Sequence, residues 1–249
     1  MRCAVVAALL GASGCGASAA DITVSAAVSL FNAFGEIGKA FEKASQGRHK
    51  VLFNFGASGS LLQQISRGAP VDVFASADLD TMDRAEKQNL IYRDSRGNFV
   101  SNRLVLAVPA KSTATLGALQ ELMAPAVQRV AMGTPESVPV GRYTKGVLEA
   151  AGLWDVLRPK MIYGQNARQC LDYLARGEVD AGFVYATDAL LMKDRMRVAL
   201  TLPTQTPIQY PIAAVKGNGQ EKSAREFVTF VLRNPLARKV FDKYGFLVP

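Results

Sequence analysis

The sequence predicts a two-lobed α/β protein in which each lobe is a mostly parallel β-sheet flanked by helices. From Asp21 onward, short apolar runs alternate with helical patterns, which is typical of parallel α/β architecture. The series is interrupted by a polar stretch over residues 93–102, restarts at Leu104, and ends with an isolated apolar run and two helical patterns. The 249 residues, 49% of them hydrophobic, are enough for two modest lobes with cores of their own.

The first lobe begins with three strand–helix units. Strands are expected at residues 22–26, 51–55 and 71–75. Leu30, Phe34, Ile37 and Phe41 recur at spacings of four, three and four, which predicts one apolar helix face after the first strand. A helix over residues 60–65 follows the second strand, and another begins at Asp78 after the third.

The second lobe follows the same alternation. Strands are expected at residues 104–108, 129–132, 161–163 and 181–184, with helices at 141–151 and 167–175. The run at 212–215 and the helices at 221–232 and 235–244 are assigned back to the first lobe. The expected boundaries are therefore residues 21–103 with 208–249 for lobe 1 and residues 104–207 for lobe 2.

Residues 1–20 have the layout of a secretory signal peptide. Arg2 supplies a positive start, residues 4–10 are apolar, and small residues follow up to Ala20. We expect export to the periplasm with cleavage near Ala20. An alternative is lipid anchoring at Cys15, because residues 12–15 weakly resemble a lipobox.

Composition removes several classes of function. His49 is the single histidine, which we expect at the surface, and no cysteine cluster accompanies it, so zinc and redox-metal sites are not predicted. The nucleotide-binding and serine-hydrolase glycine motifs do not occur. A net charge of +8 is compatible with nucleic-acid binding, but the basic residues are scattered, so no nucleic-acid partner is predicted. Cys170 falls on an apolar helix face and is expected to fill the core.

A polar or small-residue turn recurs where a strand leads into a helix. Ser29 and Ser58 each stand at such a turn in the first lobe, and residues 135–141 and 165–168 do so in the second. The first N–H groups of a helix lack intrahelical partners, and together with the helix dipole they favour an anion. Each serine alone is also explained as an N-cap. Tyr185, at the end of a predicted strand, reaches the same cleft or packs in the core.

Five segments resemble the periplasmic molybdate-binding proteins of molybdate ABC transporters. The resemblance runs in order through the chain after residue 20 and is carried by residues 21–30 (DITVSAAVSL), 68–78 (GAPVDVFASAD), 135–141 (PESVPVG), 184–189 (VYATDA) and 243–246 (KYGF). It implies the type II periplasmic-binding fold, with the ligand held between the lobes by hydrogen bonds alone.

The resemblance also implies a set of ligand contacts. Molybdate or tungstate is expected to be held by the hydroxyl and N–H groups of Ser29 and Ser58, the backbone N–H groups of Val140 and Ala167, and the hydroxyl of Tyr185. Gly56, Ala57 and Gly59 flank Ser58 where the family often has a serine-rich run. The implied partner is a membrane permease, and neither enzymatic activity nor a cofactor is expected.

Three alternatives remain open at this stage. The first is a carrier for another tetrahedral oxyanion such as sulfate; phosphate is disfavoured because its protonated form wants an acidic acceptor. The second is an enzyme on the same two-lobed fold, such as a hydroxymethylbilane synthase, for which Cys170 would have to carry a cofactor. The third is the sensor domain of a regulator. A carrier is expected to be a monomer.

Overall fold

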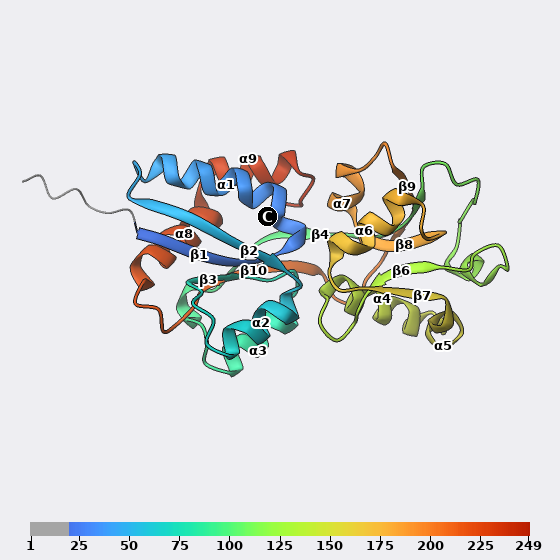
Figure 1. The fold of residues 1–249 in the computed structure, drawn as a ribbon, viewed down its shortest axis with the longest axis horizontal. Coiled ribbons are helices and arrows are strands. Elements are labelled where there is room, and N and C mark those ends of the chain that lie inside the picture. The colour runs from blue at the N-terminus through green and yellow to red at the C-terminus, as the bar shows by residue number, and fades with distance from the viewer. Residues whose placement is uncertain (1–19) are drawn as a thin grey trace, which may run out of the picture.

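The computed structural model describes residues 20–249, which form two lobes side by side, each built on one five-stranded sheet (Figure 1). The predicted signal peptide and Cys15 lie outside the described residues. In spatial order, the first sheet is β2 (His49–Gly56), β1 (Ala20–Ala27), β3 (Val73–Ala75), β10 (Ile208–Ala214) and β4 (Gly97–Asn102). The second is β7 (Met161–Gly164), β6 (Val130–Gly133), β8 (Ala181–Tyr185), β5 (Leu104–Pro109) and β9 (Met196–Leu202).

Helices cover both faces of each sheet (Figure 1). The helices packed on the first sheet are α1 (Phe31–Ala44), α8 (Glu221–Arg233) and α9 (Pro235–Lys243) on one face, and α2 (Ser58–Ser66) and α3 (Leu79–Lys87) on the other. The helices of the second lobe are α4 (Pro139–Ala150), α5 (Trp154–Leu157), α6 (Ala167–Arg176) and α7 (Ala186–Leu191). Short 3₁₀ turns occur at η1 (Val28–Leu30), η2 (Arg93–Ser95), η3 (Leu119–Met123) and η4 (Arg158–Lys160).

Strand alternation divides the core of the first lobe between these two helical layers. Val73 and Ala75 belong to the apolar cluster that includes α1, α8 and α9, whereas Phe74 between them packs with α2 and α3. Neighbouring side chains of a strand point to opposite faces, so a short buried strand must be apolar throughout. This accounts for the three consecutive apolar residues 73–75 within the run that predicted the strand.

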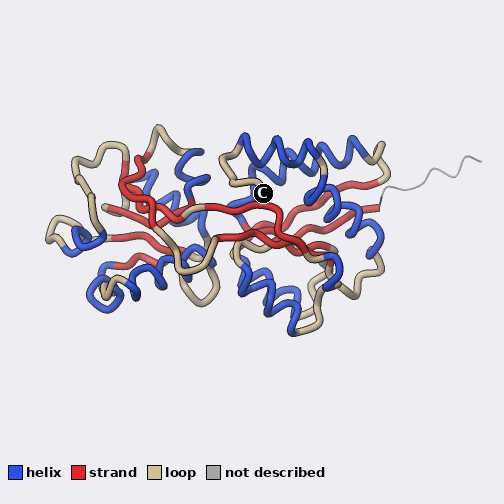
Figure 2. Tube along the Cα trace, turned by 180° about the vertical axis from the view of Figure 1, so that it is seen from behind, coloured by secondary structure: helices blue, strands red, loops and turns tan. Residues whose placement is uncertain are grey.

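The predicted two-lobed α/β class is confirmed, but the sheets are mixed rather than mostly parallel. In each sheet two strand pairs are parallel and two are antiparallel. Two neighbouring strands run parallel when a helical crossover joins them. The antiparallel pairs all contain β5 or β10, which lie near the connections between the lobes and are not joined to their neighbours in this way. Figure 2 shows strands approaching the connection from both lobes; β4 and β5 are separated by Arg103 alone.

Two of the antiparallel strands, β4 and β9, escaped sequence prediction. Both are edge strands. An edge strand needs fewer apolar residues, and β4 contains Gly97, Asn98 and Asn102, while Val198 in β9 is 45% exposed. Within residues 20–249, no helix is both long and apolar enough to cross a membrane.

Candidate functional site

The structure brings all five predicted positions to one small cavity between the lobes. Ser29 and Ser58 reach it from the first lobe, and Val140, Ala167 and Tyr185 reach it from the second. The remaining lining residues are small or apolar: Ala27, Val28, Gly56, Ala57, Ala77, Val138 and Pro139. The free volume there is about 10 Å³, roughly the room that one water molecule needs, so the cavity is small. None of the lining residues carries a charge.

Neither serine caps a helix, contrary to the structural alternative considered from the sequence. Ser29 lies within the 3₁₀ turn η1, and Ser58 is the first residue of α2; no side chain caps either element. Instead, Ser29 Oγ lies 3.1 Å from the hydroxyl of Tyr210 on β10, and Ser58 Oγ accepts a hydrogen bond from the backbone N–H of Ala77 at 3.0 Å. Both hydroxyls are buried. Because Ala77 N–H already uses a lone pair of Ser58 Oγ, the serine hydrogen is free to be donated into the cavity.

The second lobe contributes two helix N-termini. Pro139 is the first residue of α4 and has no N–H, so Val140 carries the first N–H of that helix. Ala167 is the first residue of α6, behind an N-cap at Asn166 whose side chain accepts from the Gln169 N–H at 3.0 Å. Such early N–H groups have no intrahelical acceptor, and they stand at the positive end of the helix dipole.

Tyr185 gives the clearest indication that the cavity holds a ligand. Its side chain is 1% exposed, and its hydroxyl has no hydrogen-bond partner among the described residues although it lines the cavity. Burial raises the pKa of this phenol well above its ordinary value, so it stays protonated and can donate. A buried hydroxyl without a partner costs free energy. An acceptor inside the cavity removes that cost.

The lobes are in contact around the cavity. The backbone N–H of Gly59 on α2 donates to the carbonyl of Ser137, just before α4, at 2.9 Å. Arg142 on α4 bonds Asp78, at the start of α3, through Nε at 2.9 Å and also through Nη2. The same Nη2 bonds Thr81 Oγ1 at 2.7 Å. These contacts join α2 and α3 of the first lobe to α4 of the second and the residues before it, so the described structure is a closed form.

Other groups singled out in the sequence lie elsewhere. His49 is buried rather than at the surface, with Nε2 2.9 Å from Glu226 Oε2 and its ring stacked on Phe41, because the flat ring packs against the edge of the core. Arg168 does not line the cavity; it bonds Asn32 Oδ1 of α1 at 3.2 Å. Cys170 is fully buried, and burial raises its thiol pKa to about 12, which is unsuited to a reactive nucleophile.

No metal site accompanies the cavity. Across residues 20–249, no group of three or more histidine, cysteine or acidic side chains could hold a metal ion. The cavity therefore offers hydrogen-bond donors and no metal ligands.

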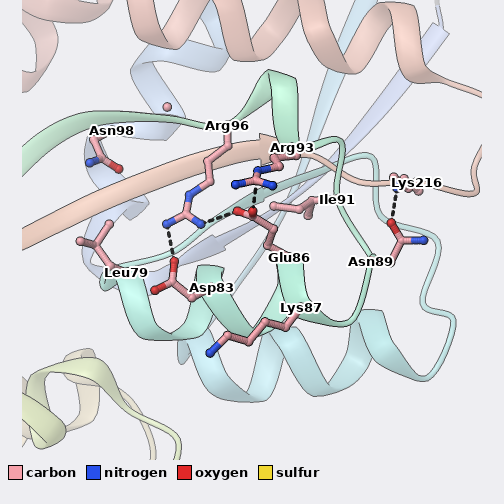
Figure 3. A pocket seen from close by; sticks show the side chains of 11 residues that line it. Leu79, Asp83, Glu86, Lys87, Asn89, Ile91, Arg93, Arg96, Asn98 and Lys216 are labelled. Carbon is pink, nitrogen blue, oxygen red and sulfur yellow. Dashed lines mark hydrogen bonds and ion pairs between the residues drawn. The ribbon is translucent and has the colours of Figure 1, made fainter.

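A much larger groove, of about 910 Å³, lies on the first lobe next to α3 and is lined by none of the five positions (Figure 3). Its two arginines are paired with its two acidic side chains. Arg96 bonds both Asp83 and Glu86 at 2.6 Å, and Arg93 bonds Glu86 at 2.9 Å. Side chains occupied in this way are not presented to a ligand, so size alone does not identify the site.

Sequence reasoning missed the residues that support the cavity from behind or close it. Tyr210, Asn102, Gly59 and Arg142 all act through contacts with residues distant in sequence. Their local patterns are those of an ordinary strand or helix. Of these four, only Gly59 had a signal in the sequence, because it flanks Ser58 where the resemblance implies a serine-rich run.

The chain matches the profile of a known protein family. The profile of the bacterial extracellular solute-binding proteins matches residues 22–247. YvgL of Bacillus subtilis, a lipoprotein assigned as the substrate-binding part of an ABC transporter, is 40% identical over 226 residues, which cover 90% of this chain and 85% of YvgL. The molybdate-binding protein ModA of Escherichia coli is 34% identical, with 91% and 89% of the two chains covered.

A solved structure shows the same fold. The periplasmic molybdate-binding protein of Azotobacter vinelandii superimposes with a TM-score of 0.78 at 23% identity, covering 92% of this chain and 99% of that one.

Proposed function

Because the chain belongs to the bacterial extracellular solute-binding protein family, we propose that it captures molybdate in the closed cavity and delivers it to the permease of an ABC transporter. Relatives at 32–34% identity over more than 90% of this chain are named molybdate-binding proteins. We extend the ligand class to tungstate, an oxyanion of the same shape and charge. The mature protein is proposed to act outside the cytoplasm as a monomer, without enzymatic activity.

The observation that carries this proposal is the unpartnered hydroxyl of Tyr185 in a cavity lined by donors. Ser58 and Tyr185 each have a hydroxyl hydrogen to give, and Val140 and Ala167 each have a helix N-terminal N–H. A fully deprotonated tetrahedral dianion offers only acceptors, so it matches this set. A protonated phosphate has a hydrogen to donate and would need an acidic acceptor, which the lining residues lack.

The neutral lining has a further consequence for the anion. The negative charge of the anion would be stabilised by the partial positive charges at the starts of α4 and α6 and by hydroxyl dipoles, and not by a formal counter-charge. Sulfate has the same charge and the same acceptors. We therefore attribute discrimination between molybdate and sulfate to cavity size.

Thermal unfolding of the purified protein tests the proposal. Molybdate and tungstate at a hundred times their Kd are expected to stabilise the fold by about 2.7 kcal/mol and to raise Tm by about 5–10 °C. Sulfate and phosphate at the same concentration should leave Tm nearly unchanged. Equal shifts with all four anions would reject the size argument, and no shift with molybdate or tungstate would reject the proposed function.

A further inference from the structure

A chain of buried polar side chains stands behind Ser29, outside the cavity. Asn102 Nδ2 lies 3.3 Å from the hydroxyl of Tyr210, and that hydroxyl lies 3.1 Å from Ser29 Oγ. Asn102 is 6% exposed and Tyr210 is wholly buried. Solvent therefore cannot exchange for these partners, and the direction of each hydrogen bond is decided within the chain.

The direction of the chain starts at the backbone. The N–H of Arg103 donates to Asn102 Oδ1 at 2.8 Å, which fixes the orientation of the amide. Its Nδ2 group then carries two hydrogens, one for Thr187 Oγ1 at 2.9 Å and one for the Tyr210 hydroxyl. Asn102 can only donate at Nδ2, so Tyr210 accepts there.

Tyr210 must then place its own hydrogen. Burial raises the pKa of its phenol, so the hydrogen stays on the oxygen at physiological pH. Ser29 Oγ is the neighbouring atom that can accept it. If Ser29 donated to Tyr210 instead, the phenol hydrogen would be buried without a partner, which is unfavourable. The favoured direction runs from Asn102 through Tyr210 to Ser29, and it leaves the Ser29 hydrogen free for the cavity.

We propose that Asn102 and Tyr210 are positioning residues that hold Ser29 as a hydrogen-bond donor toward the bound oxyanion. The inference rests on the proposed function, because it concerns the same cavity. Asn102 is the last residue of β4, where the chain leaves the first lobe, and Thr187 belongs to α7 of the second. The relay thus begins at the connection between the lobes and ends at the ligand.

The direction of the hydrogen bond between Tyr210 and Ser29 is tested by whether one substitution lowers or raises the affinity for molybdate. Tyr210→Phe removes the donor that fixes Ser29, so molybdate affinity measured by isothermal titration calorimetry should fall about 3- to 10-fold. If Ser29 donated to Tyr210, the same substitution would free its hydrogen for the ligand and affinity would rise. Unchanged or tighter binding by the Tyr210→Phe variant overturns the proposal.

A double-substitution cycle shows whether Tyr210 acts through Ser29. In the Ser29→Ala background the relay has no end point, so Tyr210→Phe should change affinity less than about twofold. An undiminished loss in that background would assign Tyr210 a general packing role and overturn the relay. Tyr163→Phe is the matched control, since it removes a phenol hydroxyl from an exposed residue of β7 that does not line the cavity, and it should bind as the unsubstituted protein does.

Asn102→Asp tests the first step. A carboxylate accepts from Tyr210, so Ser29 would turn its hydrogen toward the phenol and its lone pairs toward the anion, and affinity should fall at least about 10-fold. Combined with Tyr210→Phe, the loss due to Asp should shrink to about threefold or less. A loss that persists would mean that the new charge repels the anion directly, which overturns the role of Asn102.

Binding by the unsubstituted protein separates the two proposals. If it binds neither molybdate nor tungstate, the proposed function fails; if it binds but the variants do not follow the pattern above, the relay alone fails.

Discussion

Substitution of Gly59 by alanine should weaken ligand binding without weakening the ligand-free fold. A Cβ at Gly59 would lie 2.7 Å from the carbonyl oxygen and 2.9 Å from the Cα of Ser137, and both are backbone atoms that cannot rotate away. The same contact includes the 2.9 Å hydrogen bond from Gly59 N–H to Ser137 O. Gly59 belongs to α2 of the first lobe and Ser137 precedes α4 of the second, so the clash exists only while the lobes are closed.

The magnitude follows from the contact. Loss of one hydrogen bond and a sub-contact methyl together cost about 1–3 kcal/mol in the closed state, which corresponds to about 5- to 150-fold weaker binding. Alanine has a higher helix propensity than glycine, so the Tm of the ligand-free protein should not fall. Calorimetric titration with molybdate measures the first quantity and thermal unfolding without ligand measures the second.

Gly35 on α1 is the matched control, because a Cβ there would meet no atom within 4 Å. The Gly35→Ala variant should bind as the unsubstituted protein does and should be about 0.4–1 kcal/mol more stable. A Gly59→Ala variant with unchanged affinity would refute the reasoning. A Gly59→Ala variant whose ligand-free Tm drops by several degrees would refute it too, because Gly59 would then be needed for folding and not for closure.

Three further outcomes are expected. Tyr185→Phe should weaken molybdate binding by about 1–3 kcal/mol in calorimetry while leaving ligand-free stability intact, since the lost hydroxyl has no protein partner; unchanged affinity would place the ligand elsewhere. In a chain starting at Asp21, Cys170 should react with a thiol reagent at pH 8 only on unfolding, because burial raises its pKa to about 12; rapid labelling of the folded protein would contradict this. Burial raises the pKa of Asp188 to about 7, so the folded state keeps a proton that the unfolded chain releases near pH 4. The free energy of unfolding should therefore fall as the pH rises from about 4 to about 7. Asp188→Asn should remove this part of the pH dependence in urea titrations at pH 5 and 8, and identical profiles for both proteins would exclude the assignment.

The central strands were easier to predict from the sequence than two of the edge strands. The central strands β1, β3 and β8 were predicted because most of their residues are apolar and buried, although β1 also contains Thr23 and Ser25. The edge strands β4 and β9 were missed because polar and exposed residues are tolerated there, whereas the edge strands β2 and β7 retain apolar runs and were predicted. Two antiparallel pairings, β10–β4 and β5–β9, were missed with them. The other two, β10–β3 and β5–β8, join predicted strands, and their direction was missed because an apolar run alone does not indicate strand direction.

The candidate site shows the same division between local and long-range information. Ser29 and Ser58 could be selected because turns between a strand and a helix have a local signature. Their partners could not, because Tyr210 is 181 residues from Ser29 and joins it only through the order of strands in the sheet. Whether a serine hydroxyl donates into the cavity or caps its own helix is decided by those partners. The sequence therefore predicted the two serine positions, whereas the partners of their hydroxyls are visible only in the fold.

In the proposed function, the division of donors between the lobes would link capture to closure. Ser29 and Ser58 belong to the first lobe, while Val140, Ala167 and Tyr185 belong to the second. Opening would leave the anion with donors from one side only, and no charged side chain lines the cavity to retain it there. The ligand then favours the closed state through its differential affinity for the two states. An arginine in either lobe would hold the anion on that lobe after opening, so a neutral, divided donor set is the arrangement that allows tight capture and ready release by the same protein.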